Sequence, residues 1–154
     1  MKFEVKSANE WLYPDSIVSN IGQNKIKLSS AKAGYASCQI LFNGLELNKK
    51  IEYEINCPEN IKCEMYRLID IYVEKNTGVA GFCAEEGESV KGYTTRSAPF
   101  RVYDALKPFG DDEKTGKGTE ALYIAFKVGR DLKEGIYRSF LKLKIGEKIA
   151  QIPV

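Results

Sequence analysis

Apolar residues recur at every second position in several short stretches of the chain, and this alternation limits its fold more than any other feature. In the stretch 51–57, Ile51, Tyr53, Ile55 and Cys57 fall on one face, and acids and an asparagine fall on the other. Such a pattern is typical of a β-strand with one face buried and the other in water. The same period predicts further strands at residues 25–29, 35–42, 65–74, 122–128, 137–145 and 149–154.

Turn-forming residues separate these stretches, among them Asn43-Gly44, Cys57-Pro58 and Glu134-Gly135. No window of about twelve residues shows the period of a helix. Short antiparallel strands bury one face most simply when two sheets pack together. We therefore expect an all-β fold, a two-sheet antiparallel β-sandwich of roughly eight strands, immunoglobulin-like or galactose-binding-like, without the Cys-Trp-Cys core of antibody domains. The residues expected in its core are Ile40, Phe42, Tyr53, Ile55, Ile71, Ile124, Phe126, Leu141 and Leu143.

The composition excludes several classes of function. The 154 residues fit one domain spanning 1–154, which is long enough to bury a core without a disulfide or metal. The net charge of only +2 argues against partners such as nucleic acids or membranes, because both need a concentrated basic surface. The chain has no histidine, which excludes Ser-His and Cys-His catalysis and imidazole-bound zinc. It also lacks a glycine-rich dinucleotide motif and a Walker loop, and we expect no cofactor.

The four cysteines do not form a metal-binding pattern, since none of them stands in a Cys-x-x-Cys pair and no histidine can complete a site. We expect no metal there. Cys57 and Cys63 flank the turn Pro58-Glu59-Asn60, which could bring the two sulfur atoms together. The sequence leaves two alternatives open, a disulfide between them or small buried thiols in strands.

The region 78–118 alternates poorly and holds many of the acids and glycines. Its length suggests a functional or packing excursion, with 85–88 and 111–116 as solvated, mobile stretches. The acids around Asp111 supply oxygen ligands of the kind that calcium prefers, but they lack the EF-hand pattern, and acidic loops are usually just solvated. No acid lies in the apolar setting that would mark a proton donor of a glycosidase, so we expect no catalytic residue.

Aromatic side chains are the remaining candidates for binding. Trp11 is the only tryptophan, and burial at one end of the core is favoured over exposure, because large rings are mostly buried. If the chain binds a glycan, the candidate contacts are Trp11, Tyr13, Tyr103 and Phe109. The segment 96–109 is dense in aromatics and prolines and is expected to lie against the sandwich. Within it, Phe100, Tyr103 and Phe109 are candidates for docking another domain.

Three segments, in this order, carry a resemblance to a known family: Ile26-x-Leu28-x-x-Ala31 followed by Gln39, Tyr103-Asp104-Ala105-Leu106-Lys107-Pro108, and Gly135-Ile136-Tyr137-Arg138. They resemble short motifs in the N-terminal part of glycoside hydrolase family 123-like proteins, and Trp11 near the start also fits. The chain departs from those motifs at 32–34, where Lys-Ala-Gly replaces Arg-Asn-Glu. It also lacks the proline after Tyr103, and Ala105 replaces a second proline.

The resemblance implies an N-terminal β-sandwich whose catalytic Asp-Glu pair lies on a following (β/α)₈ barrel, for which this chain has no room. It therefore implies a non-catalytic accessory module of a glycosidase-like protein, with the catalytic domain C-terminal to Val154 as partner. Two alternatives remain open. One is an autonomous carbohydrate-binding module, and the other is a purely structural immunoglobulin-like interaction domain.

The two ends of the sequence carry weaker expectations. Residues 1–6 alternate in charge and have no apolar stretch of a secretory signal, which slightly favours the cytoplasm, or an extracellular location if a leader was removed. The final strand, 148–154, stops while its alternation is still running. Because natural termini usually end in polar residues, we expect the domain to be part of a longer chain.

Overall fold

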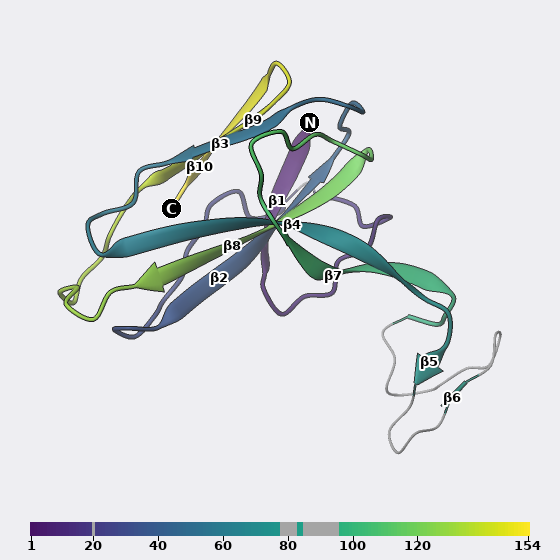
Figure 1. The fold of residues 1–154 in the computed structure, drawn as a ribbon, viewed down its shortest axis with the longest axis horizontal. Coiled ribbons are helices and arrows are strands. Elements are labelled where there is room, and N and C mark those ends of the chain that lie inside the picture. Colours follow the sequence, from purple (N-terminus) through teal and green to yellow (C-terminus); the bar gives the residue numbers. More distant parts are fainter. Residues whose placement is uncertain (20, 78–82, 85–95) are drawn as a thin grey trace.

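The computed structural model describes residues 1–19, 21–77, 83–84 and 96–154, and all regular structure among them is β-strand (Figure 1). None of the described residues belongs to a helix that could cross a membrane. The strands are β1 (Lys2–Ser7), β2 (Tyr35–Asn43), β3 (Ile51–Ile55), β4 (Ile61–Val73), β5 (Asn76–Thr77), β6 (Cys83–Ala84), β7 (Phe100–Pro108), β8 (Thr119–Val128), β9 (Phe140–Ile145) and β10 (Lys148–Pro153).

The strands form two main antiparallel sheets, as the alternation predicted. The larger sheet has five strands in the order β1-β2-β8-β4-β7, and the smaller has three in the order β10-β9-β3. A separate pair, β5 and β6, lies beyond the end of the sheet at which β4 finishes and β7 begins, which we call the far end of β4 (Figure 1). The all-β sandwich is therefore confirmed.

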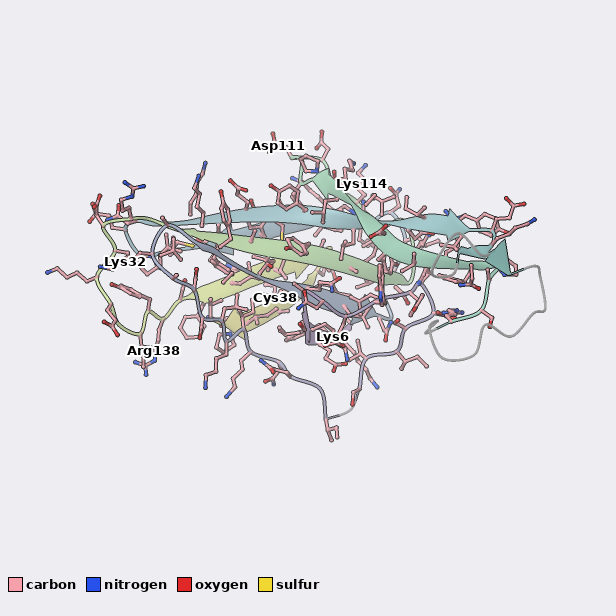
Figure 2. All side chains as sticks on the ribbon, turned by 90° about the horizontal axis from the view of Figure 1, so that it is seen from below. Lys6, Lys32, Cys38, Asp111, Lys114 and Arg138 are labelled. Carbon is pink, nitrogen blue, oxygen red and sulfur yellow. The ribbon has the colours of Figure 1, made fainter. Side chains whose placement is uncertain are left out.

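The main core fills the space between the two sheets. Six of the nine predicted core residues are buried there: Ile40, Phe42, Ile124, Phe126, Leu141 and Leu143. The alternation works because each of these strands turns one face toward the opposite sheet. Figure 2 shows Cys38, only 2% exposed, in this interior, while Asp111 projects from the surface.

Two predicted core residues were wrong, and both lie at margins of the sandwich. Tyr53 is 38% exposed because β3 is an edge strand of the smaller sheet. Ile71 is 42% exposed because β4 pairs with β8 only up to Leu68 and continues with β7 alone. Ile55 is partly buried and packs against the core.

Some predicted elements also need correction. Residues 25–29 are not a strand, although Ile26 is buried in the core and donates its backbone N–H to the Pro153 carbonyl at 2.8 Å. The strand expected from residue 137 begins at Phe140. In the expected excursion, 100–108 is the edge strand β7, and the acidic stretch 85–88 lies outside the described residues.

The loop after β7 is not a solvated acidic stretch throughout, because Glu113 and Thr115 are buried. Arg67 on β4 donates to Glu113 Oε2 at 2.9 Å and to Glu120 Oε2 at 2.7 Å. Lys107 Nζ lies 2.7 Å from Glu113 Oε1. Two cations thus occupy this carboxylate and tie the loop to the larger sheet.

Replacing Phe126 by alanine should lower the free energy of unfolding by about 3–5 kcal/mol, because the ring leaves a cavity between the sheets. The matched control is Phe140→Ala, since that ring is 56% exposed. We expect less than about 1 kcal/mol for the control. Chemical denaturation measures both values, and equal losses would contradict the assignment of the core.

Replacing Glu113 by glutamine should cost about 2 kcal/mol at neutral pH, the contribution of hydrogen bonds to a charged group. Burial alone would raise the pKa of Glu113, but the hydrogen bonds from Lys107 and Arg67 outweigh it and hold the pKa below the ordinary 4.5. The contribution is therefore complete above about pH 4.5 and is lost as the pH falls through the folded-state pKa.

Denaturation at neutral and acid pH checks this, because the difference between native protein and Glu113→Gln should shrink in acid. Asp111→Asn in the same loop is the control, since Asp111 is exposed and should have little effect at either pH. A difference that is independent of pH would show that the carboxylate charge does not stabilise the loop.

Candidate functional site

The larger sheet is covered on its outer face as well, by residues 8–19, which we call the outer strap. Leu12 and Val18 of the strap are buried against Leu41, Leu68 and Ala121. These three side chains alternate with core residues and therefore point away from the smaller sheet. The outer face thus has a small apolar layer of its own.

Two amide side chains of β2 fasten the outer strap. Gln39 Nε2 donates to the carbonyls of Ser7 at 2.8 Å and Glu10 at 2.9 Å. Asn43 Oδ1 accepts from the Val18 N–H at 2.5 Å, and its Nδ2 donates to the Ser16 carbonyl at 3.0 Å. Because these four backbone groups are bonded to side chains of a central strand, the sheet fixes the path of the strap.

On its other side the strap contacts β7. The Tyr103 N–H donates to the Leu12 carbonyl at 2.8 Å, and the Tyr103 hydroxyl donates to the Thr119 carbonyl at 2.8 Å. Asp104 has no partner in the pairing of β7 with β4, and this bulge shifts the alternation. Tyr103, in the outer layer, and Leu106, opposite Leu68, therefore share the outer face although they are three residues apart.

A shallow hollow of about 260 Å³ lies where the strap, β7 and the middle of the sheet meet. Trp11 stands at it with 58% of its surface exposed, which shows that the expected burial of this ring at one end of the core is wrong. The described residues that line the hollow are Ala8, Asn9, Glu10, Trp11, Gln39, Leu68, Tyr103, Asp104, Leu106 and Tyr123.

Some polar groups at the hollow already form hydrogen bonds within the described structure, and others do not. Glu10 Oε1 accepts from the Ser7 N–H at 3.0 Å, and Tyr123 donates its hydroxyl to Ser37 Oγ at 2.8 Å. Within the described part of the chain, no hydrogen bond or ion pair engages the carboxylate of Asp104, which is exposed. Asp104 is therefore available to accept from a ligand.

The structure brings only two of the four candidate glycan contacts to this hollow, Trp11 and Tyr103, and Tyr103 is 4% exposed. Tyr13 packs edge-on against Phe100, with ring centroids 5.9 Å apart, and the Arg96 guanidinium lies over the Tyr13 ring.

Phe109 packs against Tyr53 at 5.2 Å, beside the main core. Of the three candidates for docking, Phe100 and Phe109 are thus half-buried and Tyr103 is buried within the chain.

Sequence reasoning did not assign the outer layer, although one pattern could have indicated it. Ile40, Leu41 and Phe42 are consecutive apolar residues, and such a run is typical of a strand covered on both faces. The sequence indicated Gln39 only as one position of a family motif and not as a residue that holds the strap. Asp104, Leu106 and Tyr123 were not singled out for the hollow because their meeting depends on strand pairing and on the bulge.

The buried carboxylates next to Arg67, Glu113 and Glu120, are already bound by cations. No group of three or more potential metal ligands occurs within the described ranges. Cys57 and Cys63 are free thiols, and burial raises the pKa of Cys63 to about 12. The structure therefore has no disulfide between Cys57 and Cys63. The alternative of small buried thiols in strands holds only in part, because both side chains are half-buried and Cys57 follows β3 rather than lying in a strand.

Comparison with known proteins identifies the fold but not a family by sequence. No family model matches the chain, and no curated protein matches it. Among solved structures, the chain is similar to a family 123 glycoside hydrolase from Clostridium perfringens, described in a study of glycolipid glycan hydrolysis. The TM-score is 0.67 at 12% identity, and the match covers 99% of this chain and 26% of that one. The chain thus shares the fold of about a quarter of that hydrolase.

Proposed function

We propose that the chain is a non-catalytic β-sandwich accessory module of a carbohydrate-active, glycosidase-like protein. The observation that carries this proposal is the structural match, which takes in almost the whole chain but only a quarter of the hydrolase. The resemblance of the segments at Ile26, Tyr103 and Gly135 to family 123 motifs supports it independently of the fold.

The chemistry of the described residues agrees with a module that leaves hydrolysis to another domain. A glycosidase needs one carboxylic acid with a raised pKa and a second carboxylate about 5–10 Å away. Here Glu113 has a lowered pKa, and its neighbour Glu120 is bound to Arg67. The catalytic work would belong to a barrel that follows Val154, and this module would pack on it.

The docking surface proposed for that barrel is centred on β7 and the far end of β4. Tyr103 cannot contribute, because the outer strap covers it. The half-buried rings of Phe100 and Phe109 remain, together with Ile69 and Ile71, which are 36% and 42% exposed. Interfaces between domains of one chain bury about 600–1,500 Å², so the proposed surface would have to include residues around these side chains as well.

The hollow beside Trp11 favours a second candidate function, an autonomous carbohydrate-binding module. The two candidates are compatible, because the outer strap and the far end of β4 are different surfaces. A purely structural interaction domain would use neither surface for sugar.

We expect the 154-residue chain alone to show no hydrolysis of aryl N-acetylhexosaminides, the substrate class that the family resemblance implies. The natural polypeptide, extended beyond Val154, should carry that activity. A colorimetric release assay with both proteins measures the difference. Turnover by the 154-residue chain that disappears when one Asp or Glu is replaced would overturn the proposal, as would a stop codon directly after Val154.

In the extended polypeptide, Ile71→Asp should weaken the packing of the module on the barrel and split its thermal unfolding into two transitions. Ile17→Asp is the matched control, since Ile17 is 83% exposed on the outer strap, away from the proposed interface. Differential scanning calorimetry measures both. Identical transitions for the two variants would contradict docking through β4.

A further inference from the structure

We propose that the hollow beside Trp11 binds a single neutral sugar ring and discriminates against acidic sugars. The inference rests on the proposed function in one respect, that the ligand is a carbohydrate. It goes further because it assigns the binding site, limits the bound part of the glycan to one ring, and expects negatively charged sugars to bind more weakly.

The first argument is the exposure of Trp11. Large aromatic rings are usually buried, so an indole with 58% of its surface in water at the rim of a hollow lacks the cover that it has in a core. The carbon-bound hydrogens of a pyranose form an apolar face that stacks on such a ring. Leu68, Leu106 and Tyr123 supply further apolar and aromatic surface at the same hollow.

The second argument is that the backbone on both sides of Trp11 is already fixed. The Glu10 carbonyl accepts from Gln39, and the Leu12 carbonyl accepts from the Tyr103 N–H. Leu12 is also buried in the outer layer. A ligand would meet a ring whose backbone needs little further ordering, which lowers the entropic cost of binding.

The third argument is charge. The charged residues among the described lining are Glu10 and Asp104. Glu10 is paired with Lys6, whose Nζ lies 3.7 Å from Glu10 Oε2, whereas no described residue pairs with Asp104. Carboxylates accept hydrogen bonds from sugar hydroxyls, and such charge-assisted bonds are strong. The unpaired carboxylate of Asp104 repels uronates, sulfated sugars and phosphates, and this repulsion supplies the discrimination.

The fourth argument is size. Pockets for drug-sized ligands measure about 300–1,000 Å³, and this hollow, at about 260 Å³, lies just below that range. It has room for one ring, while the remainder of a longer glycan would extend over the surface.

The test uses the only tryptophan of the chain as its reporter, excited at a wavelength that the tyrosines do not absorb, because the emission then comes from the proposed site itself. The probes are matched pairs that differ only at C6, glucose with glucuronate and galactose with galacturonate, titrated at low ionic strength so that charge effects are not screened. We expect a saturable change in emission with at least one neutral sugar and at least tenfold weaker binding of its acid.

Two variants locate the binding. Trp11→Ala should weaken binding of that neutral sugar at least tenfold by calorimetry, whereas Phe140→Ala, which removes a comparably exposed ring on the smaller sheet, should leave it unchanged. Asp104→Asn should narrow the difference between the neutral sugar and its acid. Circular dichroism confirms that each variant is folded, and the titration of the unmodified chain does not depend on any variant.

Each contrary result has a distinct meaning. Absence of binding by both neutral sugars would overturn the inference and leave the accessory role intact. Equal or tighter binding of the acids would overturn the charge discrimination, and binding unaffected by Trp11→Ala would overturn the site. Failure of the proposed function is seen separately, as hydrolysis by the 154-residue chain.

Discussion

The hydrogen bonds of two amide side chains, Gln39 and Asn43, hold the outer strap on the outer face of the larger sheet. Both amides stand on β2, whose opposite face is locked in the core through Ile40 and Phe42. They hold the outer strap against Leu41, and this places Trp11 at the hollow. Part-buried backbone groups that lose such partners cost free energy, and this favours the observed path of the strap over the sheet. One face of the sheet thus packs in the main core, and the other carries the outer strap and the hollow beside Trp11.

The core was predictable where a strand has neighbours on both sides and a sheet opposite. In β2, β8 and β9 the alternation identified Ile40, Ile124 and Leu141 correctly, because strands on both sides and the opposite sheet shield these side chains from water. It failed at Tyr53 and Ile71, since the pattern of a strand does not show whether that strand lies at an edge or runs past the opposite sheet. It also missed β7, because the bulge at Asp104 interrupts the alternation and the pairing partner, β4, is distant in sequence.

The candidate site was predictable by residue type but not by arrangement. Trp11 and Tyr103 were singled out as aromatic, yet they have opposite environments, one exposed and the other buried. Which of them is available depends on the strap, the bulge and four strands that contribute to a single hollow. Likewise, Glu113 looked like part of a solvated acidic loop, and only the fold shows that Arg67 and Lys107 meet it.

Amide hydrogen exchange of Val18, compared between the native chain and Asn43→Ala, tests most directly whether the amides hold the strap. Val18 donates its N–H to Asn43 Oδ1, and few other contacts could protect an amide outside any strand. The account predicts that the Val18 amide is protected in the native chain and loses protection in Asn43→Ala, while the Ile40 amide of β2 stays protected in both. Exchange of the native Val18 amide at the rate of an unfolded peptide would contradict it.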